Sequence, residues 1–217
     1  MRFAILAAAL ALSLSSCGSD SGPKADPTPT GATGTPTPTA VKTATETDSG
    51  FKVLSKSELD MALLELNDMP PGFTPDKPGA SDTDKTFCDY KTPFHEKIKV
   101  AHDFTNDADQ AFISVSFRQY ATVEQAKTSF GALVSEMKTC RTEKFEGATF
   151  KYTVMSAPQL GDGSIGIQVE SQGYTIKQNF VVFGPTLIQA GGVGVTAQQI
   201  ADLLKAQVER YTAAAQP

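Results

Sequence analysis

The sequence predicts an α+β fold: an antiparallel β-sheet of about five to six strands, with three main helices packed mainly on one face and one disulfide. Apolar residues recur three and four positions apart in three segments of the 217-residue chain, and they alternate with polar residues in several others. Short glycine-containing links join the alternating segments, which favours antiparallel pairing. The order of helix, two strands, helix, four strands and helix favours α+β over a regular βαβ arrangement.

The first predicted helix begins at a capping box, Ser55-x-x-Glu58. Its expected apolar face consists of Leu59, Ala62, Leu63 and Leu66. Pro70-Pro71-Gly72 follows, and because proline cannot continue a helix, we expect the helix to end there.

Two further helices are predicted from the same kind of signal. One begins at Thr122 and leads to Cys140, which therefore faces the core; its apolar stripe is Ala126, Phe130, Leu133, Val134 and Met137. The other opens with a second capping box, Thr196-x-x-Gln199. Its apolar face is Ile200, Leu203, Leu204, Val208 and Tyr211.

Alternation of apolar and polar residues predicts the strands. The expected segments are 97–104, 113–118, 150–154, 164–171, 174–183 and 186–190. Phe150, Tyr152 and Val154 are expected on one buried face. We expect the sheet face opposite the helices, or the Phe73–Phe87 loop, to border any cleft.

The N-terminus predicts a lipoprotein signal peptide over residues 1–16. Arg2 precedes an apolar stretch that is shorter than the roughly 20 residues of a spanning helix. Leu14-Ser15-Ser16-Cys17 resembles the bacterial lipobox, and this resemblance implies cleavage before Cys17, acylation of that residue and anchoring to the membrane. The alternative is an ordinary secretory peptide in which Cys17 is incidental.

Residues 17–50 are rich in threonine and proline and predict a disordered tether, either a plain spacer or an acceptor of O-linked glycans. Residues 51–217 are long enough for a single folded domain. The chain has a net charge of −5, so binding to nucleic acid is disfavoured. We expect the domain to lie at the outer face of the cytoplasmic membrane.

Cys88 and Cys140 remain once Cys17 is assigned to lipidation. In a compartment that permits oxidation, these two residues predict one disulfide. A catalytic thiol is the alternative, but it needs a histidine partner and a reason for one cysteine to stay reduced.

Two segments match known catalytic or cofactor-binding motifs, but neither has the structural context that its motif needs. The glycines of residues 161–166 match a dinucleotide pattern, but a strand follows them, so no helix N-terminus is available for a pyrophosphate; a turn in which Asp162 bonds its own amides is the simpler interpretation. Ser135-x-x-Lys138 matches part of the motif of penicillin-recognising enzymes. It falls late in a predicted helix, however, and we interpret both residues as part of the solvent-exposed face of that helix.

The histidines and aspartates also predict no site. His95 and His102 are the only histidines, and no nucleophile motif accompanies them. His102 and Asp103 are adjacent on a strand and point to opposite faces, which disfavours a shared metal ion. The group of Asp103, Asp107 and Asp109 around Asn106 lacks the glycine and glutamate of a calcium loop, which favours a turn. We therefore expect no catalytic residue, metal or cofactor.

The arrangement of Leu63-Leu64, Asp68-Met69-Pro70-Pro71-Gly72-Phe73, Cys88, the Ala126 to Cys140 helix and Leu160-Gly161-Asp162 resembles the PknH-like extracellular sensor domains of actinobacterial lipoproteins and receptor kinases. The resemblance implies an α+β fold with a cleft for an unidentified small ligand, and it supplies no catalytic residues. The kinase domain has two disulfides, whereas this chain can form one.

The leading hypothesis is a lipid-anchored, non-enzymatic domain that binds a small molecule or an envelope component. The alternatives are a cell-envelope hydrolase with an unrecognised site and a carrier of an acyl-chain ligand, which would need a large apolar cavity.

Overall fold

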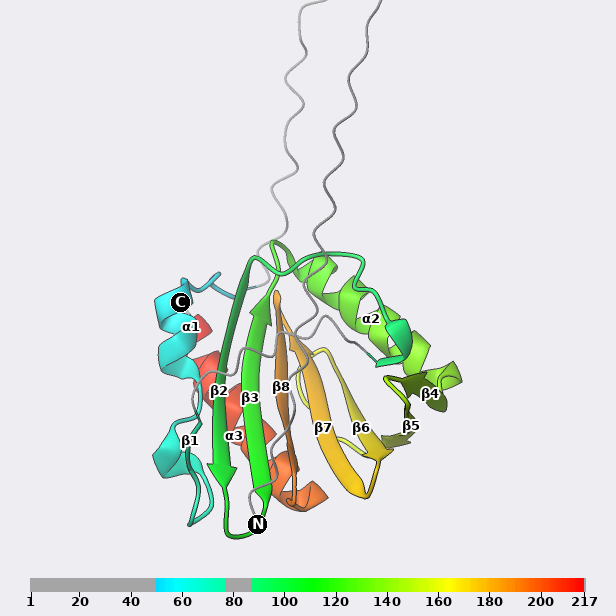
Figure 1. Ribbon diagram of the computed structural model, residues 1–217. Coiled ribbons are helices and arrows are strands. Elements are labelled where there is room, and N and C mark those ends of the chain that lie inside the picture. Colours follow the sequence, from blue (N-terminus) through cyan, green and yellow to red (C-terminus); the bar gives the residue numbers. More distant parts are fainter. Residues whose placement is uncertain (1–49, 77–86, 217) are drawn as a thin grey trace, which may run out of the picture. The chain divides into compact units, whose positions relative to one another are not determined.

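Eight strands form one antiparallel sheet in the order β1-β2-β3-β8-β7-β6-β5-β4 (Figure 1). The structure is a computed structural model that describes residues 50–76 and 87–216. The expected signal peptide, Cys17, the tether before Gly50 and the middle of the Phe73–Phe87 loop lie outside the described residues. Within the described ranges, none of the helices has the length and apolar content needed to cross a membrane.

The bounds of the elements follow the chain. The strands are β1 (Thr74–Pro75), β2 (Ile98–Asn106), β3 (Ala111–Gln119), β4 (Thr142–Phe145), β5 (Ala148–Met155), β6 (Gly163–Ser171), β7 (Tyr174–Phe183) and β8 (Thr186–Val193). The helices are α1 (Lys56–Ala62), α2 (Val123–Thr139) and α3 (Ala197–Ala215), with short 3₁₀ turns η1 (Leu66–Asp68) and η2 (Phe87–Asp89).

The sheet has eight strands, whereas five to six were expected, and two of the eight fall outside the six expected segments. Both additions, β1 and β4, are the edge strands. The first has two residues and the second has four mostly exposed ones, so neither carries an apolar alternation. The expected alternation in β5 is also only partly correct, because Tyr152 is buried whereas Val154 is 46% exposed next to the sheet edge.

Helices cover both faces of the sheet. Helices α1 and α3 pack with the Val181 and Ile188 side of the sheet, and α3 runs behind the strands in Figure 1. The apolar stripe of α2 packs with Phe180, Val182 and Leu187. Because neighbouring residues of a strand point to opposite faces, α2 lies on the face opposite the other two helices. Two of the three helices therefore share one face, as expected, and the third does not.

The first helix is shorter than predicted. It ends at Ala62 rather than at Pro70, and Leu66 falls in η1, where it is 40% exposed. The chain between them is extended and held by Gln207 of α3, which is fully buried. Its Oε1 accepts the Leu64 N–H at 3.0 Å, and its Nε2 donates to the Ala62 carbonyl at 3.2 Å. The side chain of Gln207 thus replaces the hydrogen bonds of another helical turn.

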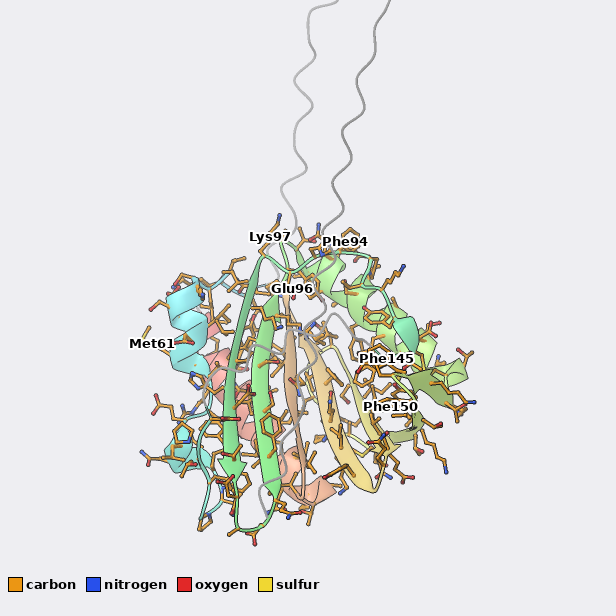
Figure 2. The ribbon with its side chains drawn as sticks, viewed as in Figure 1. Met61, Phe94, Glu96, Lys97, Phe145 and Phe150 are labelled. Atoms are coloured by element: carbon orange, nitrogen blue, oxygen red, sulfur yellow. A yellow bond between two sulfur atoms is a disulfide. The ribbon has the colours of Figure 1, made fainter. Side chains whose placement is uncertain are left out.

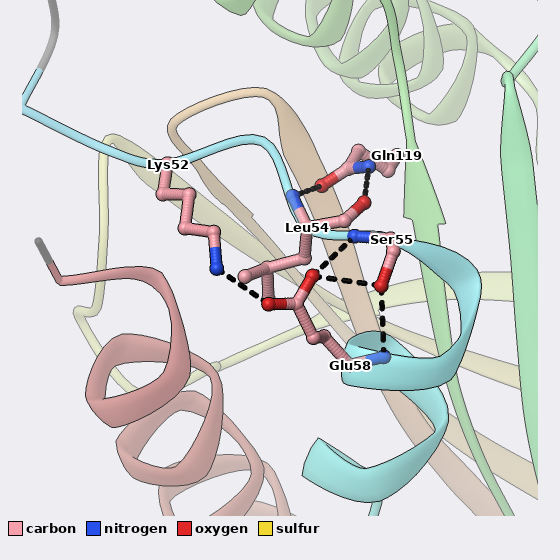
Figure 3. A network of polar contacts seen from close by, with 5 residues as sticks. All are labelled: Lys52, Leu54, Ser55, Glu58 and Gln119. Carbon is pink, nitrogen blue, oxygen red and sulfur yellow. Dashed lines mark hydrogen bonds and ion pairs between the residues drawn. The ribbon is translucent and has the colours of Figure 1, made fainter.

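A second glutamine fixes the start of the domain. Gln119 of β3 is buried; its Oε1 accepts the Leu54 N–H at 3.0 Å, and its Nε2 donates to the Leu54 carbonyl at 2.7 Å (Figure 3). The capping box of α1 forms beside it as predicted, because Ser55 Oγ accepts the Glu58 N–H. Hydrogen bonds from Lys52 and Ser55 lower the pKa of Glu58 from 4.5 to about 2.

The two ends of the described domain meet. The Lys52 N–H donates to the Ala215 carbonyl at 2.9 Å, where α3 ends. Next to this contact, Phe51 packs edge-on against Phe183, with ring centroids 4.9 Å apart.

Candidate functional site

The strand register gathers polar side chains on the sheet face that α2 shares. One cross-strand row is Gln178, Gly191, Ser114 and Asp103, and the row beside it contains Gln189, Ser116 and Ala101. We call Gln178, Gln189, Ser114, Ser116 and Asp103 the polar floor. Cross-strand neighbours on one face lie about 5 Å apart, so the polar floor extends roughly 15 Å across four strands and its adjacent members can contact one ligand.

A buried hydrogen bond organises the polar floor. Ser116 is 4% exposed, and its Oγ donates to Gln189 Oε1 at 2.7 Å. Gly191 lies beside this pair. A Cβ on Gly191 would come within 2.7 Å of Gln178 Cγ and 3.0 Å of Gln189 Nε2, so a side chain there would displace both glutamines. The two glutamines therefore converge over the backbone of Gly191.

An apolar row borders the polar floor. The cross-strand partners Ile176, Val193 and Phe112 form it, and all three are half-buried. Further along the same face, Phe150 and Phe145 lie on β5 and β4 at the sheet edge (Figure 2). The face thus changes from amide and hydroxyl groups to aliphatic and aromatic groups within one row of residues.

Helix α2 and η2 form a wall next to the polar floor. Phe87 packs edge-on against Phe180, with ring centroids 6.0 Å apart, and Phe180 is the cross-strand partner of Gln189. Tyr90 Oη donates to the Ser129 carbonyl of α2 at 2.8 Å. Burial raises the pKa of the Tyr90 phenol.

The two cysteines join η2 to the end of α2. The sulfurs of Cys88 and Cys140 lie at disulfide distance, with Cα atoms 6.2 Å apart, as the sequence predicts. Cys88 has a φ of 47°, which residues other than glycine rarely adopt. Its N–H donates to Glu143 Oε2 at 3.2 Å, and the same oxygen accepts from Tyr152 Oη at 2.7 Å. The disulfide therefore lies in a packed region in which Glu143 and Tyr152 also hold η2 in place.

The glycine motif of residues 161–166 forms a turn before β6. Gly161 has a φ of 58°, and a Cβ there would come within 2.5 Å of the Val182 carbonyl oxygen. We expected Asp162 to accept hydrogen bonds from the amides of its own turn, but its partners lie elsewhere. Its Oδ2 accepts the Gly184 N–H at 3.2 Å, and its Oδ1 lies 3.2 Å from Lys127 Nζ. Through Asp162, the turn before β6 is therefore bonded to the turn between β7 and β8 and to α2.

The histidine and aspartate candidates have other roles. His102 Nδ1 lies 3.0 Å from the Leu64 carbonyl oxygen, and it contributes to the contact between β2 and the segment after α1. Asp103 pairs with Ser114 and belongs to the polar floor on the opposite face. Asn106 Nδ2 donates to Asp109 at 2.8 Å in the β2–β3 turn. Among the residues that the structure describes, no three histidine, cysteine or acidic side chains cluster as metal ligands.

The remaining candidates are exposed. His95 lies in the loop before β2, and Ser135 and Lys138 lie on the outer face of α2, as predicted.

On the other side of the domain, α1 and α3 border an open groove. Its lining residues are Glu58, Met61, Ala62, Arg210, Ala213 and Ala214. Met61 points away from α1 and is 68% exposed (Figure 2).

Comparisons with known proteins identify the fold. No protein-family model matches the chain, and no curated protein matches it in sequence. The crystal structure of the extracellular domain of PknH from Mycobacterium tuberculosis is similar with a TM-score of 0.55 and 10% identity, over 75% of this chain and 98% of that one. This chain has the fold of that extracellular domain. The resemblance predicted from the sequence is therefore confirmed for the fold.

A second solved structure, an uncharacterized protein from Mycobacterium smegmatis, gives a TM-score of 0.36 and 10% identity, over 52% of this chain and 63% of that one. A similarity at this level carries no argument about the fold.

Proposed function

We propose that this chain is a lipid-anchored extracytoplasmic lipoprotein whose folded domain binds a ligand without transforming it chemically. The observation that carries the proposal is the polar floor, in which Ser116 fixes the amide of Gln189 through a buried hydrogen bond. Amides and hydroxyls placed in advance on a rigid sheet can bind a ligand with little loss of conformational entropy. The five members of the polar floor include no imidazole or thiol, which favours binding over acid–base or nucleophilic catalysis.

Ligand binding is testable by thermal shift on the full-length chain with fractions of cell-envelope metabolites. A ligand that binds the folded state raises its apparent melting temperature. We expect a shift in the wild type that Gln178→Ala reduces and that Gln168→Ala retains, since Gln168 lies on the opposite face of the neighbouring strand. An equal shift in both variants would place the ligand elsewhere, and no shift in broad fractions would argue against a binding function.

The proposed anchor rests on the lipobox around Cys17. We expect Cys17→Ser to remove the lipid while the domain stays folded. The variant should move from the detergent phase to the aqueous phase in phase partitioning, with an unchanged circular dichroism spectrum. If it stays in the detergent phase, lipidation at Cys17 is wrong.

A further inference from the structure

We propose that the ligand of the polar floor is a neutral, polyhydroxylated molecule, namely a glycan. The inference rests on the proposed binding function and names the class of ligand that the site takes. It follows from the hydrogen-bonding groups of the polar floor, from their charge and from the apolar row beside them.

The polar floor offers groups that both donate and accept. An amide side chain has two donors on its nitrogen and an acceptor oxygen, and a hydroxyl has one donor and two acceptor sites. Ser116 donates to Gln189 Oε1, and Nε2 of Gln189 lies over Gly191, which Gln178 Cγ also approaches. Ser114 lies in the same row as Gln178. A sugar hydroxyl also donates and accepts, so a vicinal diol can pair with neighbouring members of this set.

The charge of the polar floor disfavours an anionic ligand. Asp103 is its only charged member, and it is acidic. The cations of the described strands β2 and β3 on this face, Lys99 and Arg118, are cross-strand partners two rows away from Ser114. At about 3.4 Å per residue, this separation is roughly 14 Å along the strand. Among the described strands, a phosphate or carboxylate bound at Ser114 would thus have the Asp103 carboxylate on the next strand, whereas these cations lie roughly 14 Å away along the strand.

The apolar row completes the match to a sugar ring. Phe112 is half-buried and lies next to the polar floor on the same face of β3, because it comes two residues before Ser114. Val193 and Ile176 continue the row across β8 and β7. A pyranose or furanose ring has hydroxyls at its rim and carbon-bound hydrogens on its faces. It can therefore contact the amides with its rim while a face packs on Phe112.

The test uses the full-length chain in a detergent without a sugar headgroup, with immobilised probes of known structure. The probes are neutral hexasaccharides of glucose, mannose and arabinose, a hexauronic acid, a phosphorylated hexasaccharide and an acidic and a basic peptide. We expect at least one neutral probe to bind the wild type. We expect Gln178→Ala and Ser114→Ala each to weaken this binding by about tenfold, the effect of losing about one hydrogen bond.

Gln168→Ala is the matched control, and it should bind as the wild type does, because its side chain lies on the other face and donates to Glu170. Melting curves establish that each variant is folded; two independent variants are used so that an unfolded one does not decide the result. Binding of only the charged probes, with loss in Gln178→Ala, would overturn the glycan and leave the binding function standing. Binding of no probe together with no thermal shift in envelope fractions would overturn both.

Discussion

Replacement of Gln207 by leucine should destabilise the domain more than any exposed substitution on the same helix. Leucine has a similar volume, so the change removes the amide and leaves no large cavity. It leaves the Leu64 N–H and the Ala62 carbonyl buried without their partner. Each such group costs about 1–3 kcal/mol, which gives a loss of about 4 kcal/mol in the free energy of unfolding. A domain of this size typically has about 5–15 kcal/mol in total.

Urea unfolding followed by circular dichroism measures this loss, and a thermal melt should show a Tm lower by roughly 8–16 °C. Gln198→Leu is the control, because Gln198 is exposed on the same helix and bonds only Asp202; its effect should stay within about 0.5 kcal/mol. Hydrogen exchange at the Leu64 amide should accelerate in Gln207→Leu. A loss below about 1 kcal/mol would show that water replaces the glutamine, and it would refute the role assigned to it.

Three further predictions concern the support of the fold. The Cys88→Ser/Cys140→Ser double variant removes a disulfide between residues 52 positions apart. Its free energy of unfolding in urea should be lower by about 4 kcal/mol, and an unchanged midpoint would exclude a stabilising disulfide. Because the folded-state pKa of Glu58 is about 2, its charge stabilises the domain above pH 4.5 and less so as the pH falls toward 2. The stability gap between wild type and Glu58→Gln should therefore shrink over this range, and a constant gap would contradict it. Gly161→Ala, which meets the Val182 carbonyl, should cost more than about 2 kcal/mol, whereas Gly147→Ala, which also has a positive φ but has open space, should cost about 1 kcal/mol; equal losses would refute the steric argument.

Local signals predicted the regular elements well. The capping boxes at Ser55 and Thr196 and the cap at Thr122 each begin a helix where the sequence places it. Such signals act within a few residues and need no knowledge of the tertiary structure. The end of α1 was predicted wrongly because Gln207, which holds the chain after Ala62, comes from a distant helix.

The side of the sheet on which α2 lies was missed, although a signal existed. Phe180 and Val182 pack with α2, and Val181 between them packs with α3. A run of consecutive apolar residues indicates a strand that is covered on both faces. The sequence of β7 therefore already argued against leaving one face free of helices.

The polar floor could not be derived from the sequence, because it depends on strand register. Ser116 and Gln189 are 73 residues apart and meet only through the pairing of β3 with β8. A one-residue slip would send one of them to the other face. A glutamine followed closely by two glycines in an otherwise apolar strand was the one local sign of an unusual surface.

The hydrogen bond from Lys52 to the Ala215 carbonyl has a consequence for engineering this protein. Since the described domain begins and ends at one place, a short loop from Gln216 back to Gly50 would close the chain without distorting the sheet. New termini opened in an exposed turn, such as Gln172-Gly173, would then yield a circular permutant with the same interior. The domain could equally be inserted into a surface loop of a host protein as a cassette.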